Sequence, residues 1–189
     1  MRLVYGVVGA GAIGGVLGCS LILAGHEVHF LARNNFSDLN ESGAILESAG
    51  SKPIKRQAIS HLNVYDALVN MPKCDVVFVA VKTYDIGPLL VDLCSILKPN
   101  TAIILMQNGI DLEKDFLPLG NPVYTTVSWI KASVKESRLF QHHFGNKIKF
   151  GIFNPNPKTK IDAKSQQVRN DLKGAGISFC FEPKICCAQ

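Results

Sequence analysis

Three glycines near the N-terminus have the spacing of a phosphate-binding loop. They stand in the segment Gly9-Ala10-Gly11-Ala12-Ile13-Gly14. In a Gly-x-Gly-x-x-Gly loop the first glycine permits a tight turn, the second lets the backbone approach a diphosphate, and the third lets helix and strand pack closely. The helix that follows offers free N–H groups and the positive end of its dipole. We therefore predict a nucleotide-binding loop here; the alternative is a glycine turn with a purely structural role.

The residues around this loop have the pattern that its chemistry requires. Leu3–Val8 is a short apolar run typical of a buried strand. Residues 12–24 have a helical period, with Ile13, Val16-Leu17, Leu21 and Ala24 on one inward face, and Gly25 ends the helix. Glu27–Leu31 is a second predicted strand. A strand, turn, helix and strand within about 30 residues form a βαβ unit.

The same region also resembles a signal peptide or a membrane span, because Leu3 to Gly25 has no charged side chain and follows Met1-Arg2. Seven of these residues are glycine, and each costs a helix roughly 1 kcal/mol relative to alanine. The run also divides into a strand and a helix. We therefore expect no membrane association.

Arg33 lies at the end of the second predicted strand, about 20 residues after the last glycine of the loop. An NAD enzyme usually has an acidic residue there for the ribose 2′-hydroxyl, whereas an NADP enzyme uses arginine for the 2′-phosphate. A guanidinium can bind a phosphate through two hydrogen bonds. We therefore predict NADP(H), with Arg33 on the 2′-phosphate. The alternative is a solvated Arg33, with Asp38 or Glu41 holding a ribose.

Two further candidates follow the next long strands. Asp75–Val81 and Thr101–Met106 are apolar throughout, as parallel strands covered on both faces should be. Lys82 follows the first and Asn108 the second, at the edge where open α/β sheets bind ligands. Lys82 could contact a phosphate or carboxylate, and Asn108 a ribose or substrate. The alternatives are a surface lysine and a tight turn at Asn108.

The alternation of strands and helices predicts an α/β fold, a Rossmann-like doubly wound and mostly parallel sheet. The later strands predict an antiparallel extension of that sheet. The expected elements beyond the first unit are strands at 44–46, 54–59, 75–81, 101–106, 123–133, 139–143, 147–150 and 177–181, and helices at 85–97 and 161–173.

Composition excludes several classes of protein. The 189 residues are 47% hydrophobic and 19% charged, which excludes a disordered chain. The net charge of +5 is spread along the chain, so we expect no nucleic-acid partner. No cysteine belongs to a Cys-x-x-Cys pair, and His142 and His143 point to opposite faces of a predicted strand, so we expect no metal. Cys19, Cys94 and Cys180 lie in apolar runs and should be free thiols of a cytoplasmic protein.

In order and spacing, these motifs resemble those of ketopantoate reductase (2-dehydropantoate 2-reductase). The resemblance covers residues 1–152 well and the rest weakly. It rests on Gly9-Ala10-Gly11-Ala12-Ile13-Gly14-Gly15, Gly25-His26-Glu27-Val28 leading to Arg33, Val81-Lys82-Thr83-Tyr84-Asp85, and Gln107-Asn108-Gly109.

The resemblance implies an NADPH-dependent reduction of 2-dehydropantoate to pantoate, on the route to pantothenate and coenzyme A. Residues 9–14 would hold the diphosphate, Arg33 the 2′-phosphate, and Lys82 would lie beside the cofactor. Asn108 would sit where cofactor and substrate meet. The backbone of Ala132 would touch the nicotinamide half of the cofactor.

The family also has a helical second domain that carries the catalytic lysine, the proton donor. We expect residues 1–182 to form the dinucleotide-binding domain and residues 183–189 to begin a linker to that domain. Lys184 follows Pro183 with no tryptophan before it, so it does not match that lysine. The resemblance therefore implies that no catalytic residue lies in this chain, which should bind NADPH and turn over little.

Two other functions fit the same sequence. One is a non-catalytic NADPH-binding module. The other is a paralogous dehydrogenase that acts on another 2-oxo or 2-hydroxy acid, since substrate choice would lie in the second domain. Whether the enzyme is a 2-dehydropantoate 2-reductase or a paralogous dehydrogenase, we expect its partner to be a small 2-oxo acid substrate. We expect a homodimer only of the full-length enzyme.

Overall fold

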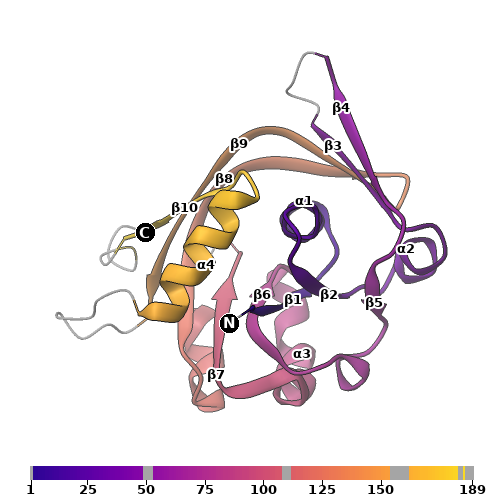
Figure 1. The fold of residues 1–189 in the computed structure, drawn as a ribbon. Helices are drawn as coiled ribbons and strands as arrows, with labels where there is room; N and C mark the ends of the chain where they lie inside the picture. The colour runs from indigo at the N-terminus through magenta and orange to yellow at the C-terminus, as the bar shows by residue number, and fades with distance from the viewer. Residues whose placement is uncertain (1, 49–52, 108–111, 154–161, 183–184, 186–189) are drawn as a thin grey trace.

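The computed structural model describes residues 2–48, 53–107, 112–153, 162–182 and 185 (Figure 1). Its helices are α1 (Ala12–Leu23), α2 (Phe36–Ser42), α3 (Ile86–Leu93) and α4 (Ala163–Gly174). Its strands are β1 (Val4–Val8), β2 (Glu27–Leu31), β3 (Ala44–Ser48), β4 (Lys55–Ile59), β5 (Asn63–Tyr65), β6 (Cys74–Val79), β7 (Leu97–Leu105), β8 (Val123–Lys135), β9 (Leu139–Ile152) and β10 (Ser178–Phe181).

The strands form one sheet in the order β4-β3-β9-β8-β7-β6-β1-β2-β5, with β10 beside β9. Across the sheet, each neighbouring pair from β8 through β7, β6, β1 and β2 to β5 is parallel. The pairs β8–β9 and β3–β4 are antiparallel. The predicted fold class, a mostly parallel Rossmann-like sheet with an antiparallel extension, is confirmed.

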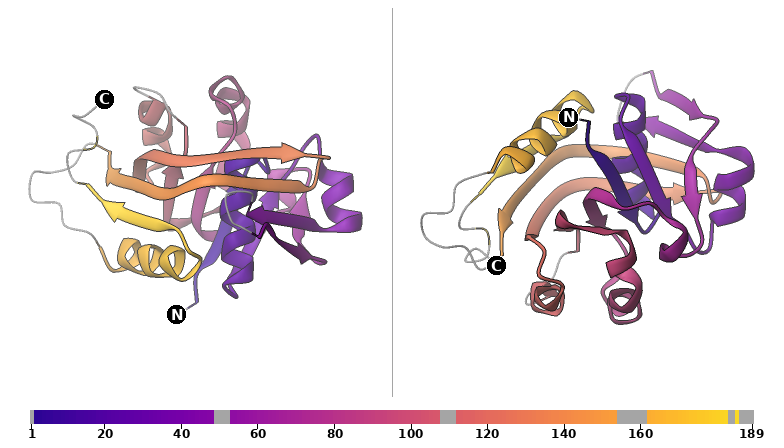
Figure 2. Two further views of the ribbon diagram at one scale, coloured as in Figure 1. Left: turned by 90° about the horizontal axis from the view of Figure 1, so that it is seen from above. Right: turned by 60° about the horizontal axis from the view of Figure 1, so that its bottom comes forward.

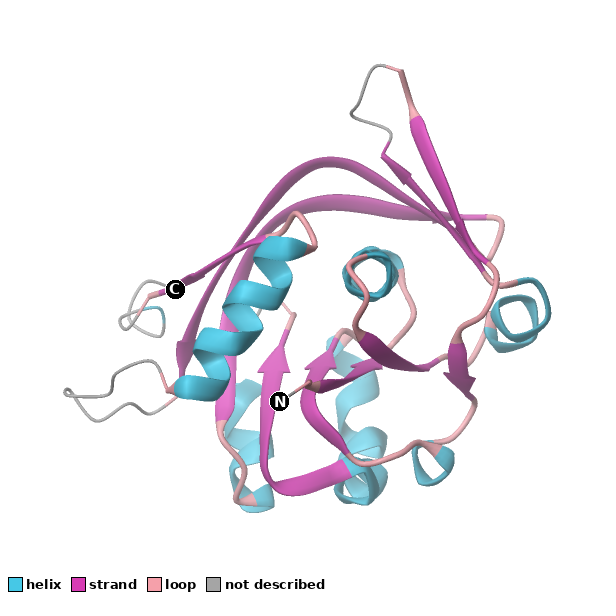
Figure 3. Cartoon of the chain, in the orientation of Figure 1, coloured by secondary structure: helices cyan, strands magenta, loops and turns pink. Residues whose placement is uncertain are grey.

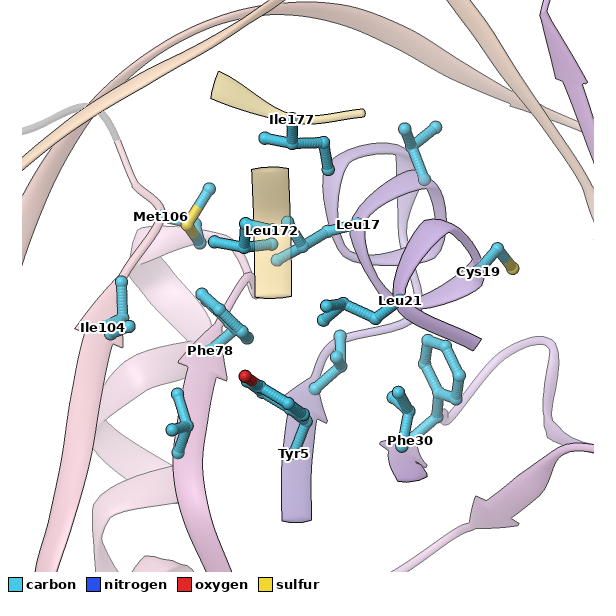
Figure 4. Packing of buried hydrophobic residues seen from close by; sticks show 14 of the residues in the cluster. Tyr5, Leu17, Cys19, Leu21, Phe30, Phe78, Ile104, Met106, Leu172 and Ile177 are labelled. Atoms are coloured by element: carbon cyan, nitrogen blue, oxygen red, sulfur yellow. The ribbon is translucent and has the colours of Figure 1, made fainter. Parts of the chain in front are cut away.

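Helices cover both faces of the parallel strands, with α1 on one face and α3 on the other (Figure 1). A hydrophobic core lies on each face of the sheet, and the side chains of β6 alternate between them. Val76 and Phe78 pack in the core that contains α1, and Val77 and Val79 pack in the core that contains α3. This alternation follows from the two-residue period of a strand and explains why β6 is apolar at every position. Figure 4 shows Leu17 and Leu21 of α1 beside Tyr5 and Phe78 of the sheet.

The antiparallel extension curls over α1, as Figure 3 shows, so that the helix is enclosed rather than lying on an open sheet. Two glycines of α1 make this packing possible. A Cβ atom at Gly15 would overlap the ring of Phe140 on β9, and one at Gly18 would overlap the ring of Phe30 on β2. The glycines that argued against a membrane helix therefore let α1 fit between two layers of sheet.

Several predicted boundaries are wrong. The strands expected at 139–143 and 147–150 are one strand, β9, which runs beside β8 (Figure 2). The helix expected at 85–97 is only α3 with a 3-10 turn on each side, and Leu97 instead begins β7, where it pairs with Cys74. Helix α1 ends at Leu23, so Ala24 is exposed instead of facing inward.

The sequence pattern did not predict four short elements. These are α2, β5 and two 3-10 helices, Leu68–Asn70 and Leu112–Leu119. Helix α2 buries only Leu39, so it has no apolar period to detect. Strand β5 has three residues and is defined by its pairing with β2.

The cysteines differ in accessibility. Cys19 and Cys74 are buried free thiols, and burial raises the pKa of each to about 12. Cys94, although it lies in an apolar run, is exposed, because α3 ends at Leu93 and Cys94 starts the following turn. Cys180 is partly buried, and Cys186 and Cys187 lie outside the described residues.

Under native conditions we expect an alkylating reagent to modify Cys94 well before Cys19 and Cys74, because only an accessible thiolate reacts quickly. Peptide mapping by mass spectrometry after timed labelling measures the three rates in one sample. Labelling in denaturant, where all three should react alike, is the control. Equal rates for Cys19 and Cys94 in the folded protein would contradict the burial described here.

In the ranges that the structure covers, no helix has the length and apolar character needed to cross a bilayer. Those same ranges contain no group of three His, Cys, Asp or Glu side chains arranged to hold a metal. His142 and His143 contact different groups, as expected for neighbours on a strand: His142 Nε2 bonds the carbonyl of Gly145, and His143 Nε2 lies 2.8 Å from Ser133 Oγ.

Candidate functional site

A cleft of about 570 Å³ opens at the carboxyl ends of β1, β2 and β6. Its volume lies within the range of about 300–1,000 Å³ that is usual for small-molecule sites. The described residues that line it are Gly9, Ala10, Gly11, Leu31, Arg33, Asn34, Asn35, Ala80, Val81, Lys82, Tyr84, Asp85, Val134 and Ser137. The cleft therefore gathers the glycine loop, the end of β2, the end of β6 and the turn between β8 and β9.

The glycine loop is shaped by close approach to the neighbouring backbone. Gly9 has a φ of 108°, and a Cβ atom there would lie 2.9 Å from the backbone nitrogen of Val81. A Cβ atom at Gly14 would overlap the carbonyl oxygen of Gly9. Gly11 is different, since a Cβ atom there would have no neighbour within 4 Å. Gly9 and Gly14 are thus required by the fold, whereas Gly11 leaves open space in the cleft.

The N-terminus of α1 faces this open space without a side-chain cap. Gly11 is the N-cap residue, and the first turn of the helix contains no acidic residue. The first N–H groups of a helix have no partner inside the helix. The loop therefore presents backbone donors and the positive end of the helix dipole to an anion.

Asn35 fixes the position of this loop, a role that the sequence did not reveal. Its Nδ2 donates to the carbonyl oxygens of Ala10, at 3.0 Å, and Ser137, at 2.9 Å. One amide side chain thus ties the glycine loop to the turn between β8 and β9, which is distant in sequence. An asparagine soon after a strand resembles an ordinary turn residue, so the sequence carried no signal for this contact.

Two cations and one carboxylate face the cleft. Arg33 Nη1 lies 3.5 Å from Asp85 Oδ1, and Lys82 lines the same space. Asp38 and Glu41, the acidic residues of the alternative reading, belong to α2 and do not line the cleft. Asp85 was not predicted as a site residue. The cleft is therefore basic, with one acidic side chain beside the arginine.

The remaining predicted residues have different placements. Ala12, Ile13 and Gly14 form the first turn of α1, behind the loop. Ala132 lies on β8, is partly buried against the core, and does not line the cleft, although Val134, two residues along the same strand, does. Asn108 lies outside the described residues. Gln107, just before it, donates to the carbonyl of Val81 at 3.0 Å, which holds the end of β7 beside the end of β6.

Residues 5–155 match the family described as Ketopantoate reductase PanE/ApbA. The chain belongs to the ketopantoate reductase family. Over 178 residues it is 30% identical to the 2-dehydropantoate 2-reductase of Nostoc sp. (strain PCC 7120), a match that covers 93% of this chain and 54% of that protein. The resemblance inferred from the motifs is confirmed.

Solved structures of a 2-dehydropantoate 2-reductase and of a D-mandelate dehydrogenase share the fold. The 2-dehydropantoate 2-reductase of Geobacter metallireducens GS-15 matches with a TM-score of 0.85 at 22% identity, covering 95% of this chain and 58% of that one. D-mandelate dehydrogenase, solved as a ternary structure with NADH and anilino(oxo)acetate, matches with a TM-score of 0.79 at 19% identity, over 98% and 58%. This chain thus spans somewhat more than half the length of these proteins.

Proposed function

We propose that this chain is the NADP(H)-binding part of a 2-dehydropantoate 2-reductase, which reduces 2-dehydropantoate to pantoate. The observation that carries the proposal is the cleft in which an uncapped helix N-terminus and Arg33 face the same space. Membership of the family and the identity to the Nostoc enzyme support the reaction. The activity of the whole enzyme is part of the proposal.

The residues present fit a dinucleotide. The open space at Gly11 leaves room for a diphosphate against the first turn of α1, and no acidic side chain of that turn opposes it. Arg33 would bind the 2′-phosphate, and Lys82 would add a second positive charge along the same wall. Ala132 and Asn108 keep their predicted roles in this proposal, near the nicotinamide and at the meeting point of cofactor and substrate.

When bound, the nicotinamide would supply a hydride to the ketone carbon of a 2-oxo acid. The chain's own contribution is to bind and orient: the loop and Arg33 would fix the two phosphate-bearing parts of the cofactor. Reduction of a ketone also needs an acid for the developing alkoxide. We propose that residues 1–182 form the dinucleotide-binding domain, that residues 183–189 begin a linker, and that the acid belongs to a helical domain beyond it.

Calorimetric titration of this chain with NADPH and NADH tests the proposal, followed by an assay of NADPH oxidation with 2-dehydropantoate. We expect NADPH to bind more tightly than NADH and turnover to be slow or absent. Binding of neither nucleotide would overturn the proposed function. Rapid turnover by this chain would instead refute the placement of the acid outside it, and faster turnover with another 2-oxo acid would favour the paralogous dehydrogenase.

A further inference from the structure

Asp85 holds the N-cap position of α3 but does not cap that helix. Its side chain makes no hydrogen bond to the backbone N–H groups of the first turn. Its backbone already has helical angles, φ −90° and ψ −6°, because the 3-10 turn Thr83–Asp85 runs directly into α3, so its side chain is not placed to cap the helix. Instead, Asp85 Oδ1 lies 3.5 Å from Arg33 Nη1. The carboxylate thus lies beside the arginine that follows β2.

This ion pair lies within the cleft rather than on a distant surface. Both side chains line the cleft, and they remain 53% and 33% exposed for Arg33 and Asp85. Among the described lining residues, Asp85 is the one with an acidic side chain. An exposed pair of this kind is weak, so a ligand with a stronger interaction can separate it.

The two nicotinamide cofactors would meet this pair differently. A 2′-phosphate must draw the guanidinium away from Asp85 and come to rest near the carboxylate, whose charge has the same sign. A 2′-hydroxyl carries no charge and can donate a hydrogen bond to a carboxylate. Asp85 therefore opposes the phosphorylated cofactor without opposing the other.

We propose that Asp85 is a specificity-determining residue of this cleft, which holds Arg33 in an ion pair and thereby lowers the preference for NADPH over NADH. The inference rests on the proposed function, since it requires that the cleft bind a nicotinamide dinucleotide. It adds a second residue to cofactor choice: Arg33 selects the phosphate, and Asp85 limits how strongly it does so.

The test is the substitution Asp85→Asn, which keeps the size of the side chain and removes its charge. We expect the ratio of NADPH to NADH affinity to rise about three- to tenfold, as expected when a weak ion pair and a repulsion between like charges are both removed. Asp92→Asn is the matched control, because Asp92 is an exposed aspartate of the same helix outside the cleft. It should leave the ratio within about twofold.

The same substitution in an Arg33→Ala background tests whether Asp85 acts through the arginine. We expect a smaller rise in the ratio there, because the ion pair is already absent and only the repulsion between like charges is left to remove. An unchanged ratio in Asp85→Asn, or the same rise with and without Arg33, would overturn the inference. Thermal melting of each variant checks that it is folded.

The two proposals fail in different ways. If the unmodified chain binds neither nucleotide, the proposed function is wrong and the inference is wrong with it. If the chain binds NADPH and Arg33→Ala weakens that binding, but Asp85→Asn behaves like Asp92→Asn, only the role of Asp85 is wrong.

Discussion

Replacing Arg33 with alanine should weaken NADPH binding roughly 10- to 150-fold, since a hydrogen bond to a charged group contributes about 1.5–3 kcal/mol. NADH binding should stay within about twofold, because that cofactor has no 2′-phosphate for the guanidinium to bind. The dissociation constants of both cofactors, measured by calorimetry on the same protein sample, give the comparison directly.

Arg169→Ala is a matched control for this prediction. Arg169 is an exposed arginine of α4 that does not line the cleft. Its replacement removes the same one positive charge from the protein as Arg33→Ala does, but at a distance from the proposed phosphate site. Arg33→Lys is informative as well, because it keeps the charge and loses the planar donor geometry. Equal losses for NADPH and NADH in Arg33→Ala would refute the role of Arg33 in choosing the cofactor.

Gly11→Val should weaken binding of both cofactors while the fold persists. Apart from its two neighbours in the chain, a Cβ atom at Gly11 meets no atom within 4 Å, so the valine side chain would extend into the space proposed for the diphosphate. Steric overlap of this kind typically costs about 1–3 kcal/mol, so we expect roughly a 10- to 100-fold loss of affinity for NADPH and NADH alike. Calorimetry measures the affinities, and a thermal melt should give nearly the same midpoint as the unmodified chain.

Gly15→Val provides the contrasting case on the same helix. Its side chain would overlap Phe140, which is fully buried, so the substitution should lower the free energy of unfolding by about 1–3 kcal/mol. Denaturant unfolding of both valine variants distinguishes a glycine that leaves room for a ligand from one that leaves room for a side chain. If Gly11→Val bound both cofactors normally, the diphosphate site would have to lie elsewhere.

The part of the fold nearest the glycine loop could be predicted because its signals are local. Strand β2 has the predicted bounds, and β1 and α1 differ from prediction by a residue or so. Each element has its own apolar period, and the glycines mark the turns between them. The same locality made Arg33 visible, since its place is defined by its distance along the chain from the loop.

The rest of the site depends on contacts between distant segments. Asn35 joins the loop to Ser137, and Asp85 reaches Arg33 from the turn after β6. Neither residue has an unusual neighbourhood in sequence, so only the packing of the sheet identifies them. Asp85 in particular resembles an ordinary residue at the start of a helix, and only its contact with Arg33 in the cleft identifies it.

The curvature of the sheet could not be predicted for a similar reason. A buried strand and a buried helix face both appear as apolar positions, and nothing local says that β8 and β9 return over α1. The small residues of α1 were a signal of close packing on a second side, but they could be interpreted only once Phe140 was seen to lie against Gly15.

A crystal structure of this chain with NADP⁺ tests the central claim most directly. We expect the diphosphate to lie within hydrogen-bonding distance of the backbone N–H groups at the start of α1, beside Gly11. The Arg33 side chain should have left Asp85 for the 2′-phosphate. A nucleotide bound away from this helix, or a 2′-phosphate in solvent with Arg33 still on Asp85, would contradict the assignment of the site.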